Sequence, residues 1–214
     1  MITDHWPLFG LRLTTPRLEL RVPDLADLAQ LAEVAAAGVH DPGHQPFAVP
    51  WTDGTPAEVA RGTLQFHWRM LGQWAPENWS LNFVTVCDGQ VIGTQAVDAR
   101  QFAMLREVGT GSWLGRAHHG HGFGTEMRAA VLELAFTGLG AQWATSEAFA
   151  DNAASYAVSR KLGYADDGVA RHVVRGRAVV GRRLRLDRAG WAAARTVDVR
   201  IEGLAPCLPM FGDL

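Results

Sequence analysis

The residues best suited to do chemistry form a glycine-rich turn, His119-Gly120-His121-Gly122-Phe123-Gly124, which leads directly into a helical pattern. Three alternating glycines remove side chains from the turn, so successive backbone N–H groups can face one ligand. The start of the helix adds unpaired N–H donors and the positive end of the helix dipole. The turn therefore predicts a site for a phosphate or diphosphate group.

Two familiar phosphate motifs do not fit this turn. A P-loop ends in Lys followed by Ser or Thr, and the turn contains no lysine. A dinucleotide fingerprint requires G-x-G-x-x-G, whereas the spacing here is G-x-G-x-G. The segment before the turn, VGTGSWLG, is typical of a short strand. The expected order is therefore strand, glycine turn and helix.

Histidines and cysteines do not indicate a metal site. His118, His119 and His121 alternate around a tight turn without converging, and neither Cys nor a carboxylate stands beside them. The two cysteines, Cys87 and Cys207, form neither a metal spacing nor a disulfide framework. We expect no bound metal and two reduced thiols, as in a cytoplasmic protein.

Length and composition favour one globular domain. The chain has 214 residues, 48% of them apolar, and a formal net charge of −2. This charge gives no electrostatic reason to expect a nucleic-acid or membrane partner. The N-terminus lacks the basic start and apolar core of a signal peptide. No apolar run approaches the roughly 20 residues that span a bilayer.

The elements that must position the turn follow from local patterns. The helix after the turn has an apolar stripe, and Glu126, Arg128 and Glu133 fall largely outside it. Residues 17–22 alternate as a half-buried strand. Asp24, Thr55 and Asn152 each occupy a helix N-cap position, and Thr55 begins a capping box. Asp88-Gly89 predicts a two-residue hairpin turn, residues 143–149 a strand, and residues 169–186 a closing hairpin.

Two segments remain open to more than one interpretation. A Pro-rich aromatic loop over residues 46–51 follows the polar cluster His40 to His44, and it is either a substrate wall or ordinary loop packing. The tail, residues 192–214, contains an alternating strand pattern around Val197 to Ile201. A lone strand must pair with something. We expect the tail to cover this subunit's sheet edge or, preferably, to form a homodimer or higher homo-oligomer.

The order of motifs resembles the GCN5-related N-acetyltransferases (GNAT), in particular the RimJ/RimL-like branch that modifies ribosomal-protein N-termini. The similarity spans about residues 11 to 191 and is carried by four segments: LTTPRLELR, CDGQVIGTQAV, SWLGRAHHGHGFGTEM and DNAASYAVSRKLGY. One position departs from the family, because His119 stands where Arg or Gln is usual. A neutral imidazole there would lack a permanent positive charge toward the diphosphate.

The resemblance implies an α/β (α+β) GNAT fold, with a mixed, mostly antiparallel sheet, one splayed strand pair and flanking helices. Residues 1–191 would form the acyltransferase domain, and residues 192–214 an extension. The activity would move an acyl group from acetyl-CoA, or from another acyl-CoA such as succinyl-CoA, to a primary amine by direct attack. The acceptor would be a protein N-terminus, a lysine or a small-molecule amine. The alternative is a non-catalytic acyl-CoA-binding or sensing protein on the same fold.

The resemblance also implies the site residues. Those that would hold CoA are Trp113, Leu114, Gly115, His119, Gly120, His121, Gly122, Phe123, Gly124, Thr125, Asn152 and Ser155. Ser155 or the adjacent Tyr156 would protonate the departing thiolate. The two face about 100° apart on a helix, so only one is expected to serve, and we favour Ser155. Glu107 and Glu147 are candidates for the general base, as is water.

The closing hairpin carries a cluster of arginines, namely Arg171, Arg175, Arg177, Arg182, Arg183 and Arg185. We favour a solvated hairpin face. The alternative is an anion site for the ribose phosphate of CoA or for an acidic acceptor. An acidic acyl donor could place its carboxylate against this cluster or the His-rich loop.

Overall fold

A nine-stranded sheet organises the chain in a computed structural model, which describes residues 1–212. The strands lie in the order β7-β8-β6-β5-β4-β3-β2-β1-β9. Their bounds are β1 Arg12–Thr14, β2 Glu19–Arg21, β3 Asn78–Cys87, β4 Gln90–Arg100, β5 Glu107–Leu114, β6 Trp143–Phe149, β7 Ala165–Val174, β8 Arg177–Asp187 and β9 Arg200–Glu202.

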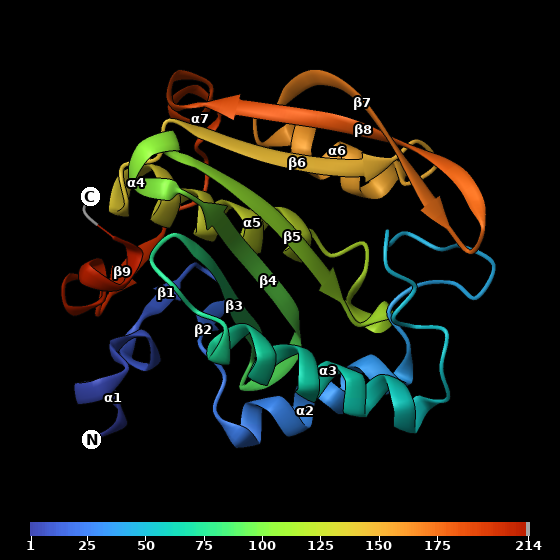
Figure 1. The fold of residues 1–214 in the computed structure, drawn as a ribbon, viewed down its shortest axis with the longest axis horizontal. Helices are drawn as coiled ribbons and strands as arrows, with labels where there is room; N and C mark the ends of the chain where they lie inside the picture. Colours follow the sequence, from blue (N-terminus) through green and yellow to red (C-terminus); the bar gives the residue numbers. More distant parts are fainter. Residues whose placement is uncertain (213–214) are drawn as a thin grey trace.

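Helices fill the connections and cover both faces of the sheet. The α-helices are α1 Ile2–His5, α2 Leu25–Ala37, α3 Pro56–Gly72, α4 Phe102–Leu105, α5 Phe123–Glu133, α6 Ala153–Lys161 and α7 Arg188–Ala194. Shorter helical turns are η1 Pro7–Gly10, η2 Arg116–His118, the π-turn η3 Leu134–Gly138 and η4 Ala205–Phe211. Helices α2 and α3 pack side by side on one face, and α5 lies on the other (Figure 1). This mixed sheet with flanking helices confirms the predicted fold class.

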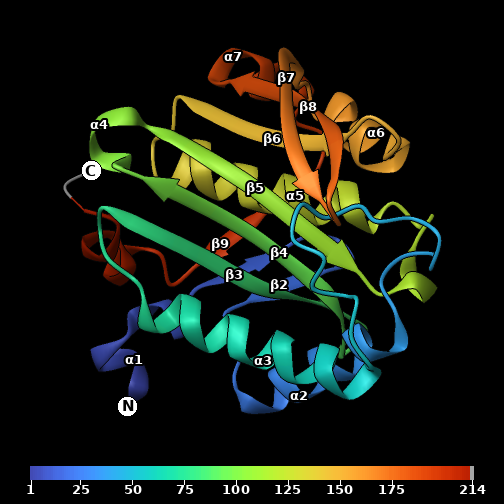
Figure 2. The same cartoon turned by 45° about the vertical axis from the view of Figure 1, so that its right-hand side comes forward.

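The sheet is antiparallel except where β5 meets β6, and this parallel pair is short. The two strands pair only from Glu107–Trp143 to Gly109–Thr145. Beyond that point β5 stays with β4 as far as Leu114, while β6 stays with β8 as far as Phe149. The strands therefore diverge, and Figure 2 shows β6, β7 and β8 leaving the plane of the other strands. The predicted splayed pair is β5 and β6.

Local sequence signals account for most element boundaries. Asp24 and Thr55 cap α2 and α3 with reciprocal capping boxes. Asn152 accepts a hydrogen bond from the backbone N–H of Ser155 at the start of α6. Asp88 and Gly89 both have positive φ, 50° and 78°, as a tight hairpin turn between β3 and β4 requires. These predicted caps and turns are confirmed.

Helix α5 is enclosed far more completely than its apolar stripe indicated. Glu126, Arg128 and Glu133, which lie outside that stripe, are only 6%, 4% and 3% exposed. Glu126 accepts a hydrogen bond from Thr15 at 2.7 Å and pairs with Arg17. Glu133 accepts one from the Trp191 indole and pairs with Arg195 at 3.2 Å. Neighbouring elements therefore cover the polar side of α5 as well as its apolar side.

The tail packs against its own chain. Strand β9 pairs antiparallel with β1, which places Ile201 opposite Leu13. Cys207 and Phe211 are fully buried, and Phe211 packs edge-on against Trp74 and Trp79. The Trp74 indole donates a hydrogen bond to the Met210 carbonyl at 2.9 Å. Because these contacts cover the apolar tail, its burial does not require a second subunit. Among residues 1–212, no helix is both long and apolar enough to cross a membrane.

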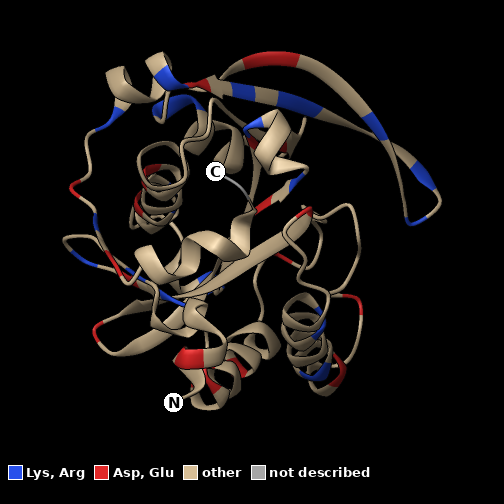
Figure 3. Cartoon of the chain, turned by 60° about the vertical axis from the view of Figure 1, so that its left-hand side comes forward, with Lys and Arg blue, Asp and Glu red and all other residues tan. Residues whose placement is uncertain are grey.

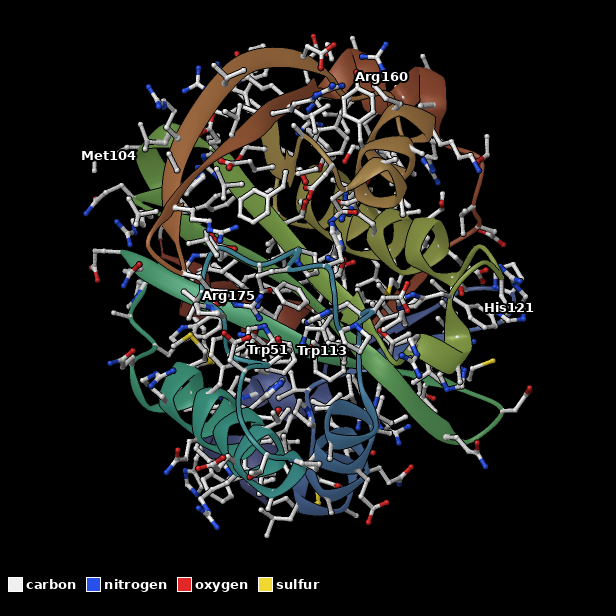
Figure 4. All side chains as sticks on the ribbon, turned by 90° about the vertical axis from the view of Figure 1, so that its right-hand side faces the viewer. Trp51, Met104, Trp113, His121, Arg160 and Arg175 are labelled. Carbon is white, nitrogen blue, oxygen red and sulfur yellow. The ribbon has the colours of Figure 1, made fainter. Side chains whose placement is uncertain are left out.

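We predict that Phe211→Ala lowers the free energy of unfolding by about 3 to 5 kcal/mol, because it leaves a cavity between two tryptophans. Chemical denaturation measures the change. Met104→Ala is the matched control, since Met104 is 74% exposed and points outward from α4 (Figure 4). Equal stability of the two variants would show that the tail does not contribute to the core.

Candidate active site

A cavity of about 610 Å³ opens where β5 and β6 diverge. This volume suits a small-molecule site. It is bounded by the glycine turn, the end of β5, the first turns of α5 and α6, and the aromatic loop over residues 46–51. The cavity includes most of the predicted CoA-binding set, namely Trp113, Leu114, His119, Gly120, Gly122, Phe123, Gly124, Thr125, Asn152 and Ser155.

The glycine turn presents backbone donors, as its sequence predicts. Gly120 and Gly122 have φ values of 80° and 82°, a left-handed conformation that side chains disfavour. Helix α5 starts at Phe123, and no side chain of residues 1–212 caps its N-terminus. The first N–H groups of α5 and the positive end of its dipole therefore face the cavity mouth, which suits an anion.

Arg17 holds this turn in place, a role that sequence reasoning missed. Its Nε donates to a Glu126 carboxylate oxygen at 2.7 Å, and its Nη1 donates to the His121 carbonyl at 3.0 Å. The guanidinium also lies 4.7 Å from the centre of the Phe123 ring. A residue between β1 and β2 thus fixes both sides of the turn and leaves a positive charge beside it.

The histidines of the turn separate from one another. His119 faces the cavity and donates from Nε2 to the Leu114 carbonyl at 3.1 Å, so it fastens the turn to the end of β5. His121 does not line the cavity and stacks on Phe123. In Figure 4 it lies well away from Trp51 and Trp113. In the part of the chain that the structure describes, no three potential metal ligands converge.

The end of β5 and the aromatic loop form one wall. Trp113 lies 5.4 Å from Trp51 between ring centres (Figure 4), and Phe47 also packs against Trp51, at 5.2 Å. Leu114 is buried, whereas Gly115 borders a neighbouring hollow rather than the main cavity. Asp53, just beyond the loop, pairs with Arg175 at the tip of the β7–β8 hairpin, at 2.8 Å. The loop therefore packs over the cavity.

The structure separates the two candidate hydroxyls. Asn152 and Ser155 both line the cavity, on the first turn of α6. Tyr156 does not line it: its hydroxyl donates to Asp166 at 3.2 Å, and Arg182 covers its ring. The angular difference between adjacent helical positions thus directs Ser155 into the cavity and Tyr156 toward β7 and β8.

A second hollow, of about 440 Å³, lies beside the point where β5 and β6 separate and holds the candidate bases. Glu107 accepts a hydrogen bond from Arg185 at 2.7 Å. Glu147 lines both hollows and contacts His172. Both predicted carboxylates are therefore brought together, and each already has a partner.

Asp98 is a third carboxylate in this hollow, and sequence reasoning missed it. It stands opposite Gly109 in the β4–β5 register, where the absence of a side chain leaves space beside it. Among residues 1–212 it accepts no hydrogen bond and forms no ion pair. Asp98 is an exposed residue of β4, although neighbouring protein atoms partly desolvate its carboxylate. This desolvation raises the pKa of Asp98, and only the nearby Arg100 opposes the shift.

Arg128 is the other missed residue. It projects from α5 into the region where the strands part and lines the main cavity. Helical periodicity gave no sign of its position, because it lies outside the apolar stripe of α5. No sequence signal could have identified it, because its burial depends on the elements that enclose α5 in the folded protein.

The predicted arginine cluster is dispersed along the β7–β8 hairpin. Figure 3 shows its basic positions spread over both strands. Arg183 donates to the Asp167 carbonyl, Arg185 to Glu107, and Arg182 covers Tyr156. These contacts favour the predicted solvated hairpin face over a single anion site.

A family model and several solved structures show what this chain is similar to. A family model for an acetyltransferase (GNAT) domain matches residues 17–165. Among solved structures, RimJ of Mycobacterium smegmatis in complex with CoA-disulfide is 18% identical, with 90% of this chain and 98% of that chain covered at a TM-score of 0.71. RimL, a ribosomal L7/L12 alpha-N-protein acetyltransferase in complex with coenzyme A, is 16% identical, with 81% and 95% covered at 0.64. A GCN5-related N-acetyltransferase of Brucella melitensis is 21% identical, with 86% and 81% covered at 0.67. At these identities the structural likenesses show a common fold.

We predict that Gly122→Val weakens acyl-CoA binding by more than about tenfold, because a side chain would stand where the diphosphate must approach the backbone. Calorimetric titration measures the affinity. Gly140→Val is the matched control: its φ of 76° imposes similar backbone strain, but no atom lies within 4 Å of the added Cβ. Unchanged affinity in a folded Gly122→Val protein would place the diphosphate elsewhere.

Proposed function

The chain belongs to the GNAT acetyltransferase family, and we propose that it moves an acyl group from CoA to a primary amine by direct attack in a ternary complex. The observation that carries this proposal is the cavity between the splayed strands, with a glycine turn and an uncapped helix N-terminus at its mouth. Residues 1–191 would form the acyltransferase domain. The extension 192–214 contributes β9 to the same sheet.

Donor binding would use the two ends of the cavity. The diphosphate would accept hydrogen bonds from the backbone of residues 120–125, with Arg17 and His119 beside it. The pantetheine arm would lie between β5 and β6 against Trp113 and Leu114, and Asn152 would contact it from α6. Gly115 and His121, outside the cavity lining, would then act through turn geometry rather than direct contact.

The reaction would proceed at the point where the strands part. The neutral amine nitrogen attacks the thioester carbonyl carbon. The developing oxyanion is stabilised by backbone N–H groups of β5 that face the β6 side, where no strand pairs with β5 beyond Gly109. The C–S bond then breaks, and the CoA thiolate takes a proton from the Ser155 hydroxyl, which takes a replacement proton from water. The amine proton passes to a base. No side chain of the protein is acylated.

For that base we propose Asp98, directly or through water, with Glu107 and Glu147 of the same hollow as alternatives. A base must be free to accept a proton. Asp98 has no partner among the described side chains, whereas Glu107 and Glu147 contact Arg185 and His172. The desolvation that raises the pKa of Asp98 also makes its carboxylate a stronger base.

We propose acetyl-CoA or another acyl-CoA as the donor, and a protein N-terminus, a lysine or a small-molecule amine as the acceptor. The name of the RimL neighbour supports an α-amino acceptor for that protein. In this chain the aromatic loop 46–51 would form the acceptor wall, since it lies over the cavity. The second candidate function is a non-catalytic acyl-CoA sensor. Assays of CoA release with and without an amine panel separate the two.

Oligomeric state and location are further proposals. The tail no longer provides the reason for a homodimer, because its apolar residues are covered within the chain. If a homodimer forms, the edge strand β7 is the better contact surface, since Val169 and Val173 are 64% and 78% exposed. Two free thiols support action in the cytoplasm. Light scattering measures the assembly state directly.

We predict that Ser155→Ala reduces kcat by about 100-fold while acyl-CoA affinity changes little, because the hydroxyl is needed mainly as the thiolate develops. Tyr156→Phe is the matched control, since its hydroxyl faces Asp166. Steady-state kinetics and calorimetry provide both values. A fully active Ser155→Ala with an inactive Tyr156→Phe would transfer the role to the tyrosine.

We predict that Asp98→Asn reduces kcat/KM by about 100-fold, as expected for loss of a positioned base. Only the deprotonated base works, so the raised pKa of Asp98 moves the acid limb of the wild-type rate profile to higher pH than an ordinary aspartate would give. That limb should disappear in the variant. Glu107→Gln and Glu147→Gln serve as comparison variants, and a loss confined to either one would assign the base to that residue.

A further inference from the structure

Arg128 is a buried cation without an anionic partner among the described residues. Its side chain is 4% exposed, and no carboxylate in the described chain pairs with it. Three serine hydroxyls surround the guanidinium: Ser159 at 2.8 Å, with Ser112 and Ser146 both at 3.4 Å. The Nε atom is buried and has no hydrogen-bond partner among residues 1–212.

A buried guanidinium without a counter-charge lowers the stability of the protein when no ligand is bound. An arginine stays protonated in proteins, and a buried charge is normally paired with an opposite charge. Serine hydroxyls are neutral, so they do not neutralise the positive charge of the guanidinium. Glu126 and Glu133, on the same helix, are committed to Arg17 and Arg195. No carboxylate of residues 1–212 therefore neutralises this guanidinium at the cavity, and a ligand can supply the counter-charge.

The position of Arg128 indicates which part of a ligand could supply this charge. Ser146 on β6 directly follows the last paired residue Thr145, and Ser112 on β5 lies three residues beyond its partner Gly109. The guanidinium therefore spans the narrow end of the divide. The diphosphate is accounted for by the glycine turn, and a pantetheine arm carries amides but no charge. The group that reaches the narrow end is the acyl group.

We propose that Arg128 binds a carboxylate at the far end of the acyl group, so that the donor is a dicarboxylic acyl-CoA such as succinyl-CoA. This inference rests on the proposed acyl-CoA function and specifies its donor. A carboxylate would occupy the free Nε and an adjacent Nη as a charge-assisted, two-point contact. Because the attack occurs at the thioester carbon, the distal carboxylate is unchanged and remains on the amide product.

The Arg128 site differs from the surfaces that sequence analysis offered for an acidic donor. The arginines of the β7–β8 hairpin lie on strands at the edge of the sheet and largely have partners. The histidines of the turn lie at the mouth, where the diphosphate would bind. Of these cationic side chains in residues 1–212, Arg128 combines burial, an unsatisfied donor and contact with the cavity.

The test compares succinyl-CoA with butyryl-CoA, which has the same four-carbon acyl length but no terminal carboxylate. Calorimetric titration of the wild-type protein should give an affinity ratio of at least about tenfold in favour of succinyl-CoA, the scale of one hydrogen-bonded charge pair. In Arg128→Met the ratio should fall to near one. Arg61→Met, which removes an exposed arginine on α3, should keep the wild-type ratio.

Each outcome is decisive. A wild-type ratio near one overturns the inference even if Arg128→Met does not fold, and so does a folded Arg128→Met protein that retains the preference. A purely structural role for Arg128 would weaken both ligands equally and leave the ratio unchanged. If neither thioester nor acetyl-CoA binds, the proposed function itself fails. Binding of all three without preference removes only the donor assignment.

Discussion

The parting of β5 from β6 after three paired residues is the constraint on which the site depends. Each strand keeps its other neighbour, so the sheet stays continuous while a gap opens within it. A gap of this kind leaves backbone groups of β5 without a partner strand, which is costly unless water or a ligand satisfies them. Gly109 and Gly111, which lie on the same face of β5 beside this gap, add no side chains to that face. The cavity is therefore a consequence of strand pairing.

Helix α5 maintains this gap through charged contacts as well as apolar packing. Glu126 joins the helix to Arg17 and thereby to the glycine turn, and Glu133 joins its far end to Trp191 and Arg195. Between them Arg128 reaches serines on both separated strands and on α6. The same helix thus presents its N-terminus at the cavity mouth and a cation at its narrow end. In the proposed function, one helix therefore contributes to both diphosphate and acyl recognition.

The family resemblance predicted the fold, and local patterns predicted the helix caps and the conformation of the glycine turn. The glycine turn, the Asn152 cap and the direction of Ser155 follow from short-range geometry, which the sequence carries explicitly. Asp98 and Arg128 could not be predicted in this way. Asp98 is a candidate because of its neighbours across the sheet, and Arg128 because no carboxylate of the described residues pairs with it. Both are tertiary properties. The tail shows the same limit: its strand pattern was visible, but its pairing with β1 was not.

A structure of the protein with bound acyl-CoA tests the central claim most directly. The account predicts the diphosphate against the backbone of residues 120–125, the pantetheine arm between β5 and β6, and the thioester beside the last paired residues, Gly109 and Thr145. An acyl-CoA bound elsewhere on the protein, with the divide between β5 and β6 empty, would contradict it.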